Sequence, residues 1–488
     1  MFARFIPFYS RFILLLLAVG FYLCLGAQQV VWANKNNLDK KTNFTKVIGQ
    51  NQHGVFVLKH KNSSFKKYFI VEHFDKKMNL LRNKMFKINN AQLEKIIVNN
   101  DGFVFFVKNF DKNNVKRLSM HFVDSSLNEI KKIDIHQTGI NAFTPLYKIY
   151  YNTDKTLYMI ASVSDSSNQS ILQYHLVKNQ EIQVHGRFVL PYAFDEMYIG
   201  DGCIDNSGQL FFLISQSQKF KSKNASDFFH YVMAFNPFTL NFQSQLINNE
   251  KTYLSNYQLV YNYQTNKVQA CGFYGENYED ENLGYFIISI LPTTLKPEHI
   301  VFKQIERSIV AQIIGVKSES KGENLNKFDI KKMIPKANGG LVMISERAFV
   351  TTQSDIFYIN GVPQSSYAKI FNNDEVLILS LDSLFQPQWT DVVNKTQSSI
   401  NDGGFYNGII TMVNDDEFNI LYNDRISANA DIVQISYNEF GRMTKKIILN
   451  NDQYYALLIP AESRQVNANS IVIPVNQNRD FTYIKLIY

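Results

Sequence analysis

The stretch NKTQSSINDGGFYNG, residues 394–408, has the residue types of a ligand-binding loop. The side chains of Asn401 and Asp402 can hydrogen-bond a ligand, and Tyr406 can add an amphipathic contact. Three of the chain's 22 glycines fall within six positions here, at Gly403, Gly404 and Gly408. Glycines also permit a tight backbone path that a side chain would block. We expect the stretch to connect two structural repeats, because the repeat described below places Trp389 on the outer strand of its sixth copy and Phe405 at the start of the seventh; a ligand role is the alternative.

Tyrosines in polar segments form a second set of candidates. Tyr274, Tyr278 and Tyr285 lie near the acidic run GENYEDENLG, residues 275–284. Such side chains could contact a partner or a glycan, although partial burial of tyrosine is also ordinary in a β-protein. The predicted ligand-binding residues are Asn401, Asp402, Tyr406, Tyr274 and Tyr278.

Carboxylates occur in two clusters, at residues 275–284 and in NDDE at 414–417. Oxygen-rich loops can hold calcium, which takes about six to eight oxygen ligands. Neither cluster has the alternating acidic spacing and internal glycine of a dedicated calcium loop, so solvated turns are favoured. No Gly-x-Ser-x-Gly or His-Glu-x-x-His motif is present, and the nine histidines occur singly. We therefore predict no catalytic residue, no metal and no cofactor.

The N-terminus has the pattern of a secretory signal peptide. Arg4 and Arg11 precede the apolar run 12–25, and cleavage after Ala27 or Ala33 would suit the small residues that follow. A retained membrane anchor is the alternative, since 12–33 could reach across about 30 Å of hydrocarbon. We expect an exported protein that is periplasmic, attached to the cell surface or extracellular.

Charge and cysteine content narrow the classes further. Removing the two N-terminal arginines changes the formal charge from +7 to +5, and the lysines are scattered among Asn, Asp and Glu. This pattern argues against nucleic-acid binding. Only Cys203 and Cys271 remain after the signal segment. We expect two buried thiols without a disulfide, although export would permit one.

Strand patterns dominate the chain, because Phe, Tyr, Val and Ile alternate with turns rich in Asn, Asp and Gly. Apolar hairpins are predicted at residues 45–60, 95–110, 147–162, 202–215, 259–275, 330–346 and 408–424. More polar hairpins follow them at 74–88, 123–135, 174–190, 235–247, 290–305, 381–393 and 437–449. The starts of the second set are separated by 49, 51, 61, 55, 91 and 56 residues.

Four strands in each period of 50-odd residues predict an all-β fold, a β-propeller of seven to eight four-stranded blades. The longest period contains an expected loop insertion near 306–327. The last strands either pack as an addendum or form an eighth blade completed by a strand from 28–42. The predicted domains are a signal peptide at 1–27 and one propeller at 43–488. Two β-sandwich domains divided near 306–327 are the alternative.

One resemblance bears on the first stretch. The segments GGLVMISE (339–346) and DEVLILSLDSLFQPQWTDVVNKTQSSINDGGFYNGIITMVNDDEFNILYND (374–424) resemble exported, largely uncharacterised propeller-like proteins of Bacteroidota. The matching residues are Trp389, Gln397, Asn401, Asp402, Gly403, Gly404, Asn423 and Asp424, whereas VVNK departs from the Ile-Pro-Lys of that group. The resemblance covers about a fifth of the chain and implies export and a repeat fold, but no activity.

The expected function is that of an exported interaction module that binds a protein or a glycan. Nucleic acid is not expected as a partner, and membrane contact is expected only through an uncleaved N-terminal segment or a partner. The alternative is a carbohydrate-active hydrolase or lyase that uses carboxylates on the loop face of the propeller.

Overall fold

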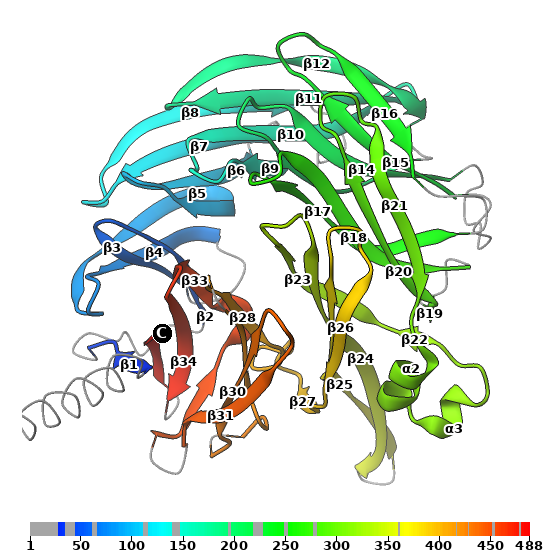
Figure 1. Ribbon diagram of the computed structural model, residues 1–488. Helices are drawn as coiled ribbons and strands as arrows, with labels where there is room; N and C mark the ends of the chain where they lie inside the picture. Colours follow the sequence, from blue (N-terminus) through cyan, green and yellow to red (C-terminus); the bar gives the residue numbers. More distant parts are fainter. Residues whose placement is uncertain are drawn as a thin grey trace, which may run out of the picture.

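The computed structural model describes residues 28–34, 44–60, 66–110, 116–138, 147–193, 197–217, 228–247, 252–276, 281–359, 362–415, 417–427, 429–450, 454–477 and 480–488. The predicted signal peptide at 1–27 lies outside these residues. All strand pairs in the described part are antiparallel, and the sheets follow one another around a ring (Figure 1). The chain is an eight-bladed β-propeller, as the strand pattern predicted.

Blades 1 and 2 share one strand. Blade 1 contains β2 (Phe44–Asn51), β3 (Gly54–His60), β4 (Lys66–Phe74) and the first half of β5 (Leu80–Val98). Blade 2 contains the second half of β5, β6 (Gly102–Phe110), β7 (Lys116–Asp124) and β8 (Glu129–Thr138). The outermost strand of one blade thus continues into the innermost strand of the next, which joins both blades in one seven-stranded sheet.

Blades 3, 4 and 5 are separate sheets. Blade 3 contains β9 (Lys148–Tyr151), β10 (Leu157–Ser166), β11 (Gln169–Lys178) and β12 (Glu181–Ala193). Blade 4 contains β13 (Met197–Ile204), β14 (Leu210–Ser217), β15 (Phe228–Phe235) and β16 (Phe242–Leu246). Blade 5 contains β17 (Tyr253–Asn262), β18 (Lys267–Gly275), β20 (Gly284–Ile290) and β21 (Pro297–Gln304).

Blades 6 and 7 flank the opening stretch. Blade 6 contains β23 (Phe328–Pro335), β24 (Leu341–Ile359), β25 (Val362–Leu381) and β26 (Pro387–Val393). Blade 7 contains β28 (Ile410–Val413), β29 (Glu417–Asn423), β30 (Ile432–Asn438) and β31 (Met443–Leu449). The paired strands β24 and β25 continue past the blade as an arm, visible at the lower edge of Figure 1. A short strand between the blades, β27 (Gln397–Ile400), pairs with β25.

The eighth blade is completed by the N-terminal end of the described chain. It contains β32 (Ala456–Leu458), the 3₁₀ turn η2 (Pro460–Glu462), β33 (Arg464–Asn467), β34 (Ser470–Gln477) and β35 (Asp480–Ile487). Strand β1 (Gln29–Trp32) pairs with β35 as its outermost strand. Of the two alternatives for the last strands, the structure shows the eighth blade closed by a strand from 28–42, and this closure removes the exposed edges that an open array would have.

The hydrophobic core consists of eight clusters, each between two neighbouring blades. Blades 8 and 1 meet through Val55 and Tyr483, and blades 6 and 7 meet through Ile378 and Ile420. The alternating strand pattern supplies these contacts, because residues at every second position of an inner strand face the same neighbour. Each blade is thus stabilised from both sides, which explains why one four-stranded sheet would not be stable alone.

The insertion near 306–327 is more ordered than the predicted loop. It contains α2 (Arg307–Ile314), α3 (Val316–Glu319) and β22 (Leu325–Asn326), and β22 pairs with β19 (Glu281–Asn282). The apolar side of α2 packs on the core between blades 5 and 6 through Val310 and Ile313. This packing stabilises a helix whose local sequence reads as loop-like.

Bulges recur on the strands nearest the axis. A register shift interrupts the pairing of the innermost strand with the second strand in blades 1, 2, 4, 5, 6 and 8. A bulge leaves one residue unpaired and increases the local twist, so it changes where the following side chains point. The bulges of β5 and β23 lie immediately before Lys95 and Lys332.

Candidate functional site

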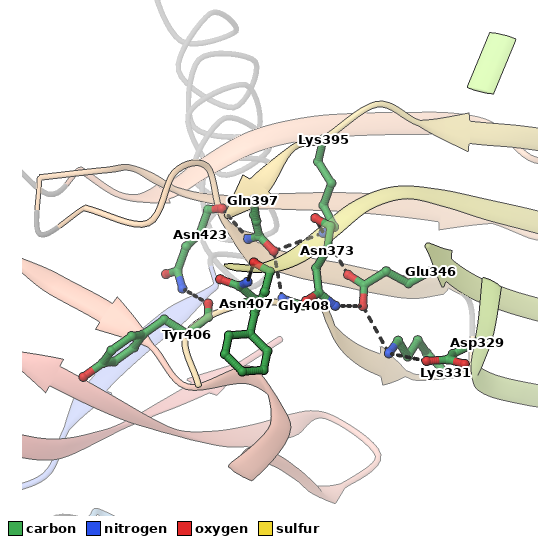
Figure 2. A network of polar contacts seen from close by, with 11 residues as sticks. Asp329, Lys331, Glu346, Asn373, Lys395, Gln397, Tyr406, Asn407, Gly408 and Asn423 are labelled. Atoms are coloured by element: carbon green, nitrogen blue, oxygen red, sulfur yellow. Dashed lines mark hydrogen bonds and ion pairs between the residues drawn. The ribbon is translucent and has the colours of Figure 1, made fainter. Parts of the chain in front are cut away.

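The opening stretch forms a polar network between blades 6, 7 and 8 (Figure 2). Lys395 Nζ lies 2.8 Å from Glu346 Oε1 and donates a hydrogen bond to the Asn373 carbonyl at 2.7 Å. Lys331 Nζ lies 3.3 Å from Glu346 Oε2, which also accepts a bond from the Asn373 amide at 2.8 Å. The carboxylate of Glu346 is thus surrounded by two cations and an amide donor.

Gln397 and Asn423 connect this network to the next two blades. Gln397 Oε1 accepts from the Gly408 amide at 2.8 Å, and its Nε2 donates to the Asn423 carbonyl at 2.7 Å. Asn423 Nδ2 donates to the carbonyls of Tyr406 and Leu458, and its Oδ1 accepts from the Leu458 amide. Gln397 is 1% exposed and Asn423 is 0% exposed, so both residues are internal braces.

The predicted ligand residues of the stretch are also engaged within the protein. Asn401 has a φ of 55° and exchanges two hydrogen bonds with the backbone of Lys369. Asp402 Oδ1 accepts from the Ser399 hydroxyl at 2.6 Å and from the Gly404 amide at 2.8 Å. The Tyr406 hydroxyl accepts from Asn476 Nδ2 at 2.6 Å. These contacts explain the conformation of the connection, and a ligand role for the three residues stays a prediction.

Trp389 lies on β26, the outermost strand of blade 6, as the repeat pattern predicted. Its ring stacks on Tyr437 of blade 7 with the centroids 5.7 Å apart, and its Nε1 donates to the Glu439 carbonyl at 3.0 Å. A Cβ atom at Gly441 would lie 2.7 Å from the Trp389 ring, so this turn requires glycine. Trp389 therefore holds two blades together.

The predicted tyrosine candidates do not share a surface in the described part of the chain. Tyr274 is 8% exposed and Tyr285 is 3% exposed, and both pack in cores between blades. Tyr278 and the rest of segment 277–280 of the acidic run lie outside the described residues. No group of three His, Cys, Asp or Glu residues in the described part could hold a metal ion.

Cations from several blades meet at the axis of the propeller. Burial lowers the pKa of Lys95, Lys155 and Lys332, and the positive charge of Arg464, which begins β33 of blade 8, lowers each of them further. Those lysines belong to blades 2, 3 and 6, and residues from such separated blades can approach one arginine only in the central channel. Lys148, which begins β9, also lowers the pKa of Lys95. The channel therefore contains five cationic side chains.

Most of these cations have no ion-pair partner among the described residues. Within the part of the chain that the structure describes, Lys148, Lys155 and Lys332 make no side-chain hydrogen bond or ion pair. Arg464 Nη1 donates to the Ile48 carbonyl at 3.0 Å. Lys332 is exposed by surface area, yet partial desolvation lowers its pKa and the charge of Arg464 adds to the effect. The charges near these cations are therefore only partly neutralised, by Asp201 close to Lys95 and by Glu94 in the same cavity.

Lys95 shows the electrostatic consequence most clearly. Desolvation lowers its pKa to about 8, and the charges of Arg464 and Lys148 act in the same direction, whereas Asp201 opposes them. Its Nζ donates to the Ile149 carbonyl at 2.7 Å and lies 5.2 Å from the centroid of the Tyr151 ring. A bound anion would favour the charged form of this lysine.

A polar cavity of about 380 Å³ opens beside these cations. Its lining includes Lys95, Lys148, Glu94, Asp201 and Cys203. Glu94 lies 3.9 Å from Lys108, and Asp201 accepts a bond from the Leu259 amide at 3.0 Å. The cavity is large enough for a small ligand or one end of a larger partner.

The two cysteines are free, as expected. Cys271 is buried, whereas Cys203 is only partly buried and lines the polar cavity. Burial and the charges of Asp201 and Asp205 raise the pKa of the Cys203 thiol, which disfavours the reactive thiolate. In the described part of the chain, no helix has the length and apolar character needed to span a membrane.

The sequence interpretation missed the cations near the axis, because these lysines are far apart in the chain and look like scattered surface charges. The available signal was their repeat position, since Lys95 and Lys332 each precede the apolar second strand of a predicted hairpin. Their common direction depends on the inner-strand bulges, for which the sequence has no evident marker.

Comparisons with known proteins do not assign the chain to a family. It matches no protein-family model and no curated protein. Prolyl oligopeptidase B from Galerina marginata, bound to a 35mer hydrolysis and macrocyclization substrate, is 10% identical with a TM-score of 0.43. That match covers 90% of this chain but 56% of the oligopeptidase, so this chain spans little more than half of its length.

Two further solved structures show the same limit. The WD40 domain of SCAP from fission yeast is 10% identical with a TM-score of 0.41, covering 95% of this chain and 98% of that domain. A protein of unknown function from Bacteroides caccae is 9% identical with a TM-score of 0.30, covering 72% and 93%. These likenesses assign no family, and membership of an exported Bacteroidota group stays a prediction.

Proposed function

We propose that this protein is an exported propeller that binds a protein or glycan partner by receiving its acidic groups in the central channel. The observation that carries the proposal is the convergence of Lys95, Lys148, Lys155, Lys332 and Arg464 near the axis, three of them without an ion-pair partner among the described residues. Low-dielectric walls around positive charges concentrate their electrostatic field. An anionic group is therefore attracted more strongly there than on an open surface. Export rests on the N-terminal pattern and the resemblance to Bacteroidota proteins.

The test is isothermal titration calorimetry with the mature chain and two anionic probes, hexaglutamate and trigalacturonate. We expect at least one probe to bind, with an affinity that falls as salt rises. Replacing Lys155 and Lys332 by glutamine together should weaken this binding by about tenfold, the equivalent of about 1.4 kcal/mol. The matched control is Lys446→Gln, because Lys446 is exposed on the outermost strand of blade 7.

Two outcomes would reject the binding proposal. The first outcome is that neither probe binds. The second is that the double variant binds the probe as tightly as Lys446→Gln does. A hydrolase or lyase remains the second candidate because Glu94 and Asp201 line the same cavity. Chromatography of trigalacturonate after incubation separates the candidates, since a binding module returns the probe unchanged and an enzyme shortens it.

A further inference from the structure

An apolar pocket of about 200 Å³ lies between blades 3 and 4. Ala161, Val163 and Leu172 line it from blade 3, and Met197 and Phe212 line it from blade 4. Engineered apolar cavities of about 150 Å³ hold a benzene molecule. The pocket between the blades can therefore accept one aromatic ring or a compact aliphatic group.

This pocket adjoins the polar cavity of the channel. Lys148 and Tyr150 line both spaces, so they form the boundary between them. Lys148 makes no ion pair or side-chain hydrogen bond in the described part of the chain. Lys148, a lysine without an ion-pair partner among the described residues, thus borders a space that favours apolar atoms, and Glu94 and Asp201 line the polar side of that border.

We propose that this double pocket binds the C-terminal residue of a partner polypeptide, with the terminal carboxylate at Lys148 and an apolar side chain between blades 3 and 4. This inference rests on the proposed function, because it names the group that enters the channel. The pairing of one carboxylate with one ring-sized side chain is what a terminal Phe, Leu or Met presents. The polar cavity, about 380 Å³ in volume, leaves room for the backbone of the preceding residues.

Exposed Tyr198 supports this mode of binding. It lines the apolar pocket and is 68% exposed, which is unusual for an aromatic side chain beside an apolar cavity. A partner backbone that leaves the pocket could cover this ring and remove apolar surface from water. Tyrosine is well suited to such contacts, since it adds a large rigid surface at a small entropic cost.

The experiment compares four ligands by isothermal titration calorimetry with the mature chain. They are acetyl-Gly-Ser-Gly-Phe as the free acid, the same peptide as its amide, acetyl-Gly-Ser-Gly-Ser as the free acid, and 3-phenylpropanoate. We expect the first peptide to bind at least about tenfold more tightly than the other three. Equal affinity for acid and amide, or for Phe and Ser, would reject the inference, and equal affinity for 3-phenylpropanoate would indicate a small-acid site instead.

Two variants locate the binding. Val163→Phe places a larger side chain at the partly exposed wall of the apolar pocket. It should lower the affinity for the Phe peptide by at least about fivefold, while hexaglutamate binding persists. Lys148→Gln removes the cation without disturbing any described partner, and it should reduce the preference for acid over amide to near unity. If Val163→Phe unfolds, Lys148→Gln still decides the matter.

The two proposals fail in different ways. Retained hexaglutamate binding without any acid-over-amide preference rejects only the C-terminal site. Both proposals are rejected by a different result. In that case hexaglutamate and trigalacturonate do not bind, and the Phe peptide binds tightly with an affinity that Lys148→Gln leaves unchanged.

Discussion

Lys395 Nζ lies 2.8 Å from Glu346 Oε1, and the two side chains are 1% and 0% exposed. The pair joins the connection between blades 6 and 7 to the second strand of blade 6. Two charges withdrawn from water require close geometry and further hydrogen bonds to offset their desolvation. Asn373 and Lys331 supply those contacts around the carboxylate. Residues 394–408, which have the residue types of a ligand loop, therefore serve in large part to connect blades 6 and 7.

The first prediction concerns this pair. Glu346→Ala should lower the free energy of unfolding by about 3 to 5 kcal/mol, because Lys395 would remain buried without its partner. Combining Glu346→Leu with Lys395→Met should recover most of that loss, since no uncompensated charge remains. Urea denaturation of both variants measures the difference. If the single and double variants are equally destabilised, the loss does not come from an unpaired charge.

The second prediction concerns the brace at Asn423. Asn423→Ala removes three hydrogen bonds to Tyr406 and Leu458 and leaves backbone groups of both residues unsatisfied. We expect a loss of about 2 to 4 kcal/mol in the free energy of unfolding. Its exposed neighbour is the control, and Asp424→Asn should change stability by less than about 0.5 kcal/mol. Thermal and chemical unfolding that does not distinguish the two variants would contradict the bracing role.

The third prediction concerns closure of the ring. Trp32 stacks on Tyr454 with the centroids 5.6 Å apart, and β1 completes blade 8 by pairing with β35. Because the Trp32 side chain is half-buried, Trp32→Ala should cost about 2 kcal/mol, less than the loss of a fully buried tryptophan. Differential scanning calorimetry measures the change. An unaltered melting temperature after removal of residues 28–33 would show that β1 does not stabilise the ring.

The fourth prediction concerns pH. Lys95 has a pKa of about 8 in the folded chain against an ordinary value of 10.5. Between these values the unfolded state binds more protons, so this lysine makes stability rise with pH, by at most about 1.4 kcal/mol per pH unit. The contribution is measured as the difference between the wild type and Lys95→Met in urea denaturation from pH 7 to pH 10. Parallel profiles for the two proteins would exclude a depressed pKa at Lys95.

Anion binding should raise the pKa of Lys95, whereas folding lowers it. An anion in the channel favours the charged form of Lys95, so binding near pH 8 to 9 should take up protons. Calorimetry in buffers with different ionisation enthalpies measures this uptake. Arg464→Gln should raise the pKa of Lys95 in the free protein and so reduce the uptake. An uptake that Lys95→Met leaves unchanged would assign the proton to another group.

The repeat was predictable because it is written in local patterns. All fourteen predicted hairpins occur, from β2 and β3 at 44–60 to β30 and β31 at 432–449. Alternation of apolar residues and the chemistry of Asn, Asp and Gly turns act over fewer than about 20 residues. The placement of Trp389 on an outermost strand followed from that repeat.

The described parts of the predicted ligand site show the limit of local reasoning. Asn401 and Asp402 have the residue types of a binding loop, but their polar atoms bond to Lys369, Ser399 and Gly404. A polar loop side chain can hydrogen-bond either a ligand or nearby groups of the protein. Which of the two occurs depends on where the neighbouring strands lie relative to the loop. The sequence also predicted a loop where the structure has helix α2. The reason is the same, since the helix is stabilised by packing against blades 5 and 6.

The sequence by itself determined the β-hairpins, their period and the blades that they form. Only the tertiary structure decided which residues meet at the axis. Lys95 and Arg464 are 369 positions apart (464 − 95), and they approach one another because the ring closes through β1 and β35. Hydrophobic alternation specifies which face of a strand is buried, but the channel depends on ring closure and on bulges that local patterns do not encode.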